Sequence, residues 1–318
     1  MTVLSSATAP STTERIVPPP QMTIPQQYVH RSHDADVLLS HFTAEADGTY
    51  RLAVRWPRAH ALFPPAGGGR ENPMLMAETV RQSGAVVSHV VFDAPLDQHF
   101  LLWNLRYEVP ADVYAAALPL APTEALVRCT DVRLRGRKLS EFRTEVELYR
   151  GSLLVGRGDC RATCVSDAAY RRLRPPRPRP AIPAPPLPPV APARVGRDRV
   201  EDVLISESGS PGTWLLRVDR DHPVIFDSQS DHVPGRALIE AMRQTAAATT
   251  GRGQSVAPAL DAEFHRYVEL DEPCALTAEP GPRLSHGRTS VRVTLHQSDV
   301  PAATGLVTLG AADRDPAP

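Results

Sequence analysis

Two similar stretches decide the fold: NPMLMAETVRQSGAVVSH at residues 72–89 and PGRALIEAMRQTAAATT at residues 234–250. In both, apolar residues cover most of the circumference of an α-helix, which is typical of a helix buried on all sides. Asn72 followed by Pro73 can cap the first stretch, and Gly251 stands where the second would end. We therefore predict two long buried helices.

A histidine precedes each predicted helix at the same distance. His60 lies 18 residues before Glu78 (78 − 60), and His222 lies 18 residues before Glu240 (240 − 222). Each Glu begins an ExxRQ motif. The segments ADVLLS and YRLAVRWPRAH lead to the first histidine, and EDVLIS and WLLRVDRDH lead to the second. The shared order of strand, His, Glu and Arg-Gln indicates a duplicated unit.

Strand-like runs follow each helix. They are HFLLWNLRYEV and SEFRTEVELYRGSLLVGRGDCRATCV in the first half, and ALDAEFHRYVEL, RTSVRVTLHQS and AATGLVTLG in the second. One long buried helix wrapped by an antiparallel sheet is the hot-dog arrangement. The predicted fold class is α+β, a tandem double hot-dog.

Composition divides the chain into four parts. Residues 1–24, rich in Ser and Thr, are expected to be a disordered leader, not a signal peptide. The two hot-dog repeats are expected at 25–170 and 195–312. Between them, a linker at 171–194 contains RPPRPRPAIPAPPLPPVAPAR, whose prolines favour extended polyproline II. A semi-rigid spacer is the favoured interpretation of this linker over a ligand for an SH3-type domain.

Bulk properties exclude several classes of protein. The formal net charge is −1, and no basic recognition helix is present, so no nucleic-acid partner is expected. No run approaches the ~20 apolar residues of a membrane span. The four cysteines have no zinc-ligand or CxxC spacing, which indicates reduced thiols in a cytoplasmic protein and predicts neither a metal nor another cofactor. They are Cys129, Cys160, Cys164 and Cys274.

Each predicted helix carries three polar residues on one face, at spacings i, i+3 and i+4. A buried carboxylate is costly unless it is paired, so an internal ion pair that pins the helix to the sheet is one interpretation. The other is an acid/base set with the preceding histidine, in which the arginine holds a phosphate or an oxyanion. The two sets are Glu78, Arg81 and Gln82, and Glu240, Arg243 and Gln244.

The segment before the second helix, DHPVIFDSQSDHVPG, is a sharper motif than its counterpart. It places Asp231 and His232 just before the helix, whose terminal N–H groups can stabilise a developing oxyanion. Gly235 would let a substrate approach those groups closely. In the first half the loop PPAGGGREN, residues 64–72, takes this place, and its glycines are a weak phosphate-binding signal.

Taken together, WPRAH…NPMLMAETVRQSG…HFLLWNLRYEV and DHPVIFD…DHVPG…LIEAMRQ resemble the A-factor biosynthesis (AfsA-type) proteins of actinomycetes, which consist of two hot-dog repeats. The likeness spans roughly residues 25–310. HVPGRALIEAM is also similar to the helix start of hot-dog acyl carrier protein dehydratases. Their GHFPGHP pattern is absent, however, because FDSQSDH stands in its place, which argues against dehydration.

The A-factor resemblance implies a specific reaction. The hydroxyl of dihydroxyacetone phosphate attacks a β-ketoacyl thioester on acyl carrier protein, and the resulting ester closes by aldol condensation to a phosphorylated butenolide, a precursor of γ-butyrolactone-type signalling molecules. On this likeness, Glu78 or Glu240 would be the general base, and His60 or His222 would assist it or orient the substrate. The arginines of the two ExxRQ motifs would bind phosphate.

Several alternatives stay open at this level. The sharper motif of the second repeat favours Glu240 and Arg243, but the sequence does not decide which repeat works. A hot-dog thioesterase or dehydratase would use similar residues without a phosphate-bearing substrate. A non-catalytic acyl-binding module is the third interpretation. Two hot-dog units in one chain already form the usual pseudo-dimer, so a homodimer of whole chains is compatible but not required.

Overall fold

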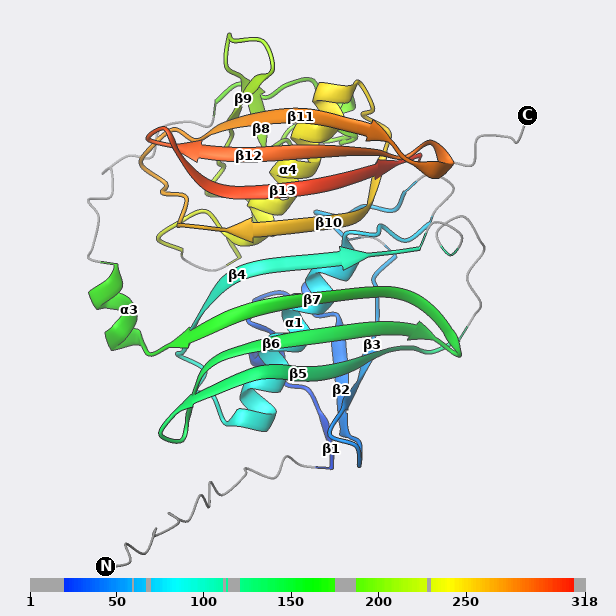
Figure 1. Ribbon diagram of the computed structural model, residues 1–318, viewed down its shortest axis with the longest axis vertical. Helices are drawn as coiled ribbons and strands as arrows, with labels where there is room; N and C mark the ends of the chain where they lie inside the picture. The colour runs from blue at the N-terminus through cyan, green and yellow to red at the C-terminus, as the bar shows by residue number, and fades with distance from the viewer. Residues whose placement is uncertain are drawn as a thin grey trace, which may run out of the picture.

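The computed structural model describes residues 20–58, 60–66, 70–110, 113, 121–174, 187–227 and 230–311. In this part of the chain a single antiparallel sheet of 13 strands curls around two helices, α1 (Leu75–Phe92) and α4 (Gly235–Thr250) (Figure 1). The predicted fold class, α+β with two hot-dog units, is confirmed.

The first unit surrounds α1 with the strands that precede and follow it. Its elements are β1 (Gln21–Thr23), η1 (Gln26–Val29), η2 (Asp34–Asp36), β2 (Leu39–Ala44), β3 (Tyr50–Val54), β4 (His99–Glu108), β5 (Thr123–Arg135), β6 (Lys138–Arg150) and β7 (Leu153–Val165). The short helix α3 (Asp167–Leu173) follows β7 and stands at the side of the molecule (Figure 1).

The second unit repeats this plan around α4. Its elements are η4 (Pro192–Val195), β8 (Ile205–Glu207), β9 (Thr213–Leu216), β10 (Val256–Phe264), β11 (Ala275–Arg283), η5 (Ser285–Gly287), β12 (Thr289–Gln297) and β13 (Val300–Gly310).

The strand order displays the duplication. It runs β1-β2-β3-β5-β6-β7-β4-β10-β13-β12-β11-β9-β8, so each half is the reverse of the other about the β4–β10 junction, with β1 as an addition. These two strands pair antiparallel, with Asp261 opposite Arg106. The Tyr107 hydroxyl also donates a hydrogen bond of 2.8 Å to the Ala257 carbonyl across the junction. One continuous sheet therefore holds α1 and α4 side by side.

Alternation along the strands builds the core. In β6 the residues at 142, 144, 146 and 148 are buried, as are those at 291, 293 and 295 in β12, so one face of the sheet packs on the helices. Each helix approaches a strand closely at a glycine. A Cβ at Gly158 would lie 2.5 Å from a Val80 methyl, and one at Gly305 would lie 2.5 Å from the Met242 sulfur.

The observed boundaries differ slightly from the predicted ones. Helix α1 begins at Leu75, after a turn at residues 73–74. The Asn72 side chain accepts the amide of Met74, two residues on, which is the hydrogen bond expected of a capping residue, and it donates to the Pro64 carbonyl. Gly251 ends α4 in the left-handed conformation, as expected. Strand β1 begins at Gln21, inside the predicted leader, and α3 occupies the start of the predicted linker. Residues 175–186 of that linker lie outside the described residues.

No helix in the described ranges combines the length and apolar character needed to cross a membrane.

The two helix-packing glycines should respond differently to alanine. A Cβ at Gly158 also meets the Arg106 carbonyl oxygen at 2.7 Å, which is backbone, whereas Gly305 meets only the flexible Met242 side chain. We expect Gly158→Ala to lower the free energy of unfolding by about 1–3 kcal/mol and Gly305→Ala to lower it by less. Urea unfolding measures both, and a larger loss in Gly305→Ala would contradict this packing.

Candidate active site between the two repeats

The same ionic arrangement surrounds the glutamate of each central helix. Burial alone would raise the pKa of Glu78, but Arg31, Arg81 and Arg236 hold it well below its usual value. Arg31 donates to both Glu78 oxygens at 2.8 and 2.9 Å, and Arg81 donates at 2.8 Å. Gln82 adds a third donor at 2.8 Å.

Glu240 has an equivalent set of partners. Arg197 donates to it at 2.5 Å, Arg243 at 2.8 and 2.9 Å, and Gln244 at 2.7 Å. Burial would raise the pKa of Glu240, but Arg197 and Arg243 keep it below its usual value. Its side chain is 0 % exposed, and those of Arg197 and Arg243 are 3 % and 4 % exposed. This second arrangement is therefore sealed inside the protein.

The two glutamines hold backbone in place and have no free amide group. Gln82 accepts from the Leu38 amide and donates to the Asp36 carbonyl and to Glu78. Gln244 makes the matching bonds to Leu204, Asp202 and Glu240. Both side chains thus tie the segment before β2 or β8 to the central helix.

The two predicted histidines have a similar positioning geometry. The His60 Nδ1 atom accepts the amides of Leu62 and Phe63, and His222 Nδ1 accepts those of Val224 and Ile225. The proton of each neutral ring is therefore on Nε2, which lies 3.3 Å from Asp36 in the first repeat and 3.1 Å from Asp202 in the second. Burial lowers the pKa of His60. A ring nitrogen that already carries a proton is not available as a base.

A cavity of about 450 Å³ lies between the repeats. Four of the residues predicted as site residues line it: Glu78, Arg81, His232 and Gly235. The others lie outside its lining: Glu240, His60, His222, Arg243, Gln82, Gln244 and Asp231. The cavity therefore combines the glutamate of the first repeat with the helix start of the second, whereas the sequence had favoured Glu240 and Arg243.

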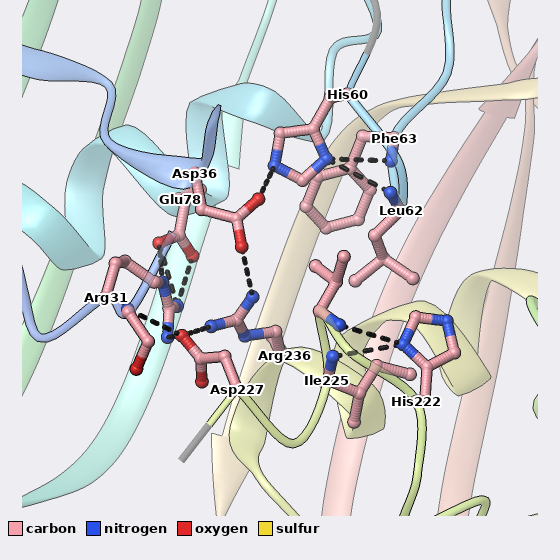
Figure 2. A network of polar contacts seen from close by, with 12 residues as sticks. Arg31, Asp36, His60, Leu62, Phe63, Glu78, His222, Ile225, Asp227 and Arg236 are labelled. Atoms are coloured by element: carbon pink, nitrogen blue, oxygen red, sulfur yellow. Dashed lines mark hydrogen bonds and ion pairs between the residues drawn. The ribbon is translucent and has the colours of Figure 1, made fainter. Parts of the chain in front are cut away.

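An ionic network joins the two repeats at this cavity (Figure 2). Arg31 pairs with Glu78 and lies 3.8 Å from Asp227 of the second repeat. Asp227 lies 3.2 Å from Arg236 Nη2, and Arg236 reaches Asp36 of the first repeat at 3.7 Å. The helix and strand patterns did not predict Arg31, but a repeated motif marks it: VxRxxxxDVL occurs at 29–38 and again at 195–204.

Asp231 and His232, the predicted pair before α4, lie at the cavity, where His232 forms part of the lining. His232 Nδ1 lies 2.6 Å from Asp231, whose carboxylate also accepts from Tyr170 at 2.8 Å and from Arg174 at 2.9 Å. Burial would raise the pKa of Asp231, but its hydrogen bonds to His232, Arg174 and Tyr170 lower it. Asp231 thus anchors His232 and the end of α3. The glycine loop at 67–69 lies outside the described residues.

The two glutamates should differ in what their loss costs. We expect Glu240→Gln to lower the free energy of unfolding by about 3–5 kcal/mol, because it leaves Arg197 and Arg243 buried without a counter-charge. Glu78→Gln should cost less, since Arg31 keeps Asp227 and the Arg81 side chain is 24 % exposed. Denaturant unfolding of both variants tests this, and equal losses would contradict the sealed and open environments.

Comparison with known proteins agrees with this architecture. The A-factor biosynthesis hotdog domain matches residues 12–166 and again 180–313. A 2-oxo-3-(phosphooxy)propyl 3-oxoalkanoate synthase of Streptomyces virginiae is 41% identical over 292 residues, covering 92% of this chain and 99% of that protein. The synthase of the same name from Streptomyces coelicolor is 33% identical over 276 residues, covering 87% and 88%.

A 12:0-ACP thioesterase from Umbellularia californica is similar in structure with a TM-score of 0.44 and 10% identity, covering 82% of this chain and 92% of that one. The two family matches coincide with the two structural repeats, and the sequence identity extends over nearly the whole chain. The chain belongs to the A-factor biosynthesis hot-dog family.

Proposed function

We propose that this chain transfers a 3-oxoacyl group from a thioester to the free hydroxyl of dihydroxyacetone phosphate. The products are a thiol and the 2-oxo-3-(phosphooxy)propyl ester for which the Streptomyces relatives are named. The methylene between the 3-oxo group and the ester carbonyl can then attack the ketone of the dihydroxyacetone phosphate part. Loss of water from that aldol gives a phosphorylated butenolide, a precursor of γ-butyrolactone-type signals.

One observation carries the proposal: Arg236, which lines this cavity, has a guanidinium nitrogen that makes no hydrogen bond in the described part of the chain, although Asp227 lies 3.2 Å from it. Arg236 lines the cavity, its side chain is 6 % exposed, and its Nη2 atom has no hydrogen bond among the described residues. An unmet donor of this kind is costly in a buried site. A phosphate oxygen is a fitting acceptor, because guanidinium and phosphate form strong charge-assisted hydrogen bonds.

The charges around the cavity favour an anionic ligand. Its lining contains four arginines and two acids, a formal excess of +2 (4 − 2). Asp36, one layer behind Arg236, reduces this excess to +1. These side chains are Arg31, Arg81, Arg236 and Arg266, with Glu78 and Asp227. Hydrolysis of an uncharged thioester would not call for such a set, whereas a phosphate-bearing acceptor does.

The rest of the cavity suits an acyl thioester. Small and apolar residues of α1, β4, β6 and β7 contribute to its lining, and the cavity volume lies within the usual range of ligand pockets, about 300–1,000 Å³. These residues are Ala77, Gly84, Ala85, Phe100, Phe142, Cys160 and Ala162. Gly235, where α4 begins, also lines the cavity, and N–H groups of the first turn can stabilise the oxyanion of the attacked carbonyl.

Glu78 supports this chemistry as a positioning group. Its two oxygens accept hydrogen bonds from Arg31, Arg81 and Gln82, so the carboxylate is occupied by protein donors. We therefore assign it the orientation of the phosphate-binding arginines. His60 acts behind it by holding Asp36, which in turn faces Arg236.

We further propose acyl carrier protein as the carrier of the thioester and the cytoplasm as the location. The four free cysteines support a reducing compartment. The carrier follows from the likeness to the family, and comparing carrier-bound with coenzyme A-bound substrate would test it. Residues of one chain line the cavity, so the proposed reaction does not require a homodimer of whole chains. Such a dimer is compatible with the fold.

Mass spectrometry of the purified protein with a 3-oxoacyl thioester tests the reaction. We expect a new phosphorylated ester or butenolide only when dihydroxyacetone phosphate is present. Dihydroxyacetone, which offers the same hydroxyl without phosphate, is the matched control and should give at most trace product. Free 3-oxo acid formed at the same rate with or without the phosphate would identify a thioesterase, and absence of turnover with several acyl lengths would favour a binding module.

Arg236 should contribute to phosphate affinity. The first repeat has Met74 at the equivalent position, so Arg236→Met replaces the residue by one that the fold already accommodates there. We expect the KM for dihydroxyacetone phosphate to rise about 10- to 150-fold, the equivalent of one hydrogen bond to a charged group of about 1.5–3 kcal/mol. Steady-state kinetics measures this. Arg283→Met, exposed at the end of β11, is the control, and an unchanged KM for Arg236→Met would reject the assignment.

A further inference from the structure

A histidine next to Arg31 has no counterpart in the second repeat. His30 lines the cavity in the left-handed conformation, with φ of 51°, and the equivalent residue is Gly196, with φ of 62°. The match is fixed by Val29 and Val195, whose carbonyls accept from Arg81 and Arg243. A non-glycine residue with positive φ is uncommon, so this imidazole is placed at some conformational cost.

A chain of hydrogen bonds fixes the protons of this ring. His89 Nδ1 lies 2.6 Å from the Ala94 carbonyl oxygen, which can only accept, so Nδ1 carries the proton. Burial lowers the pKa of His89, which keeps the ring neutral and leaves Nε2 as an acceptor. That atom lies 2.7 Å from His30 Nε2, which must therefore be the donor. The Nδ1 atom of His30 keeps a lone pair and has no partner among the described residues.

Aromatic neighbours hold the ring in this orientation. His89 stacks on His30 at 5.0 Å between ring centroids, and Phe100 contacts its edge at 5.4 Å. The charged and titratable groups that face it are Arg31 beside it, Arg81 and His89 on α1, and His99 on β4. Burial, followed by Arg81, His89 and Arg31, lowers the pKa of His30 to about 3, so the ring is neutral at physiological pH.

We propose that His30 is the catalytic residue that accepts the proton of the attacking hydroxyl, and that His89 is its positioning residue. This rests on the proposed function. As the hydroxyl oxygen bonds to the thioester carbonyl carbon, its proton moves to His30 Nδ1. When the tetrahedral intermediate collapses, the C–S bond breaks and the proton passes from His30 to the sulfur, which leaves as a thiol. The ester and the thiol contain all the atoms of the two substrates.

The neighbouring arginines make this base dependent on the acceptor substrate. Arg31 and Arg81 lower the proton affinity of His30 as long as they face it without a phosphate. A bound phosphate dianion would offset the part of this lowering that Arg81 and Arg31 cause, and so raise the pKa of His30 above its ligand-free value. The base would then be effective only when the phosphate-bearing hydroxyl is present, which protects the thioester from attack by water.

Two substitutions test the role of His30. Asn tolerates the left-handed conformation, and Gly is the residue that the second repeat uses there. We expect His30→Asn and His30→Gly to lower kcat about 10²- to 10⁴-fold, the range of general-base catalysis, with little change in the KM for dihydroxyacetone phosphate. Added imidazole should restore part of the rate in His30→Gly alone. His41→Asn, exposed on β2, is the control and should keep full activity.

Further measurements distinguish this role from a structural one. Calorimetric binding of glycerol 3-phosphate should persist in both variants, which shows that the site is folded. The acidic limb of the wild-type kcat–pH profile should disappear in His30→Gly and shift in His89→Phe. ¹⁵N NMR should show the His30 ring protonated on Nε2, with a pKa that rises when glycerol 3-phosphate binds.

Other outcomes overturn the proposal. Wild-type kcat in His30→Asn, together with its loss in His232→Asn, would assign the base to His232. Loss of glycerol 3-phosphate binding along with activity would make His30 a structural residue. Failure of the proposed function is a separate result, because the wild-type protein itself would then form no phosphorylated ester.

Discussion

The burial of a carboxylate at the centre of each helix is the constraint on which the structure depends. A charge cannot remain there without partners, because its transfer from water costs several kcal/mol even after relaxation. Each carboxylate is neutralised by an arginine and paired with a glutamine from its own helix. A second arginine comes from the segment before β2 in the first repeat and before β8 in the second. For Glu78 these are Arg81, Gln82 and Arg31. The segments between η1 and β2, and between η4 and β8, are held in place because Arg31 and Arg197 bind the buried glutamates of the helices.

The duplication then provides two copies of the arrangement in different surroundings. Pairing of β4 with β10 brings the start of α4 against the ionic set of the first repeat. There α4 supplies Arg236, and the segment before α4 supplies Asp227. The ion pairs of Glu78 therefore lie at a cavity that residues of both repeats line. On the opposite side α1 offers Met74 where α4 has Arg236. Glu240 therefore remains a sealed ion pair, and neither it nor Arg197 and Arg243 line the cavity between the repeats.

The local features could be read from the sequence because they depend on periodicity and order. The apolar surfaces of the two helices, the His-to-Glu spacing of 18 and the alternation in β12 are all properties of single segments. Which of the two glutamates lines the cavity could not be predicted. That depends on which residues of the two repeats come together when β4 pairs with β10. The motif before α4 was informative, but its residues His232 and Gly235 line the cavity together with Glu78, and Glu240 does not line it.

The roles of the histidines were equally out of reach of the sequence. His60 and His222 recur at matched positions, which suggested chemistry, yet backbone amides fix both tautomers with the proton facing an aspartate. His30 gave no periodic signal because the second repeat has glycine there. The repeated histidines therefore share a repeated backbone contact, and their predicted part in the chemistry stays a prediction.

Departure from the repeat identifies the site more sharply than repetition does. His30 against Gly196 and Arg236 against Met74 are two exchanges at residues that line the cavity, and each places a polar side chain in one repeat only. The sealed copy neutralises its buried glutamate without a counterpart of either residue, and Arg236 only adds to the effect of Arg31 and Arg81 on the pKa of Glu78. Because a buried polar group is costly unless it is satisfied, the presence of the His30 and Arg236 side chains at the cavity is best explained by a ligand that satisfies them.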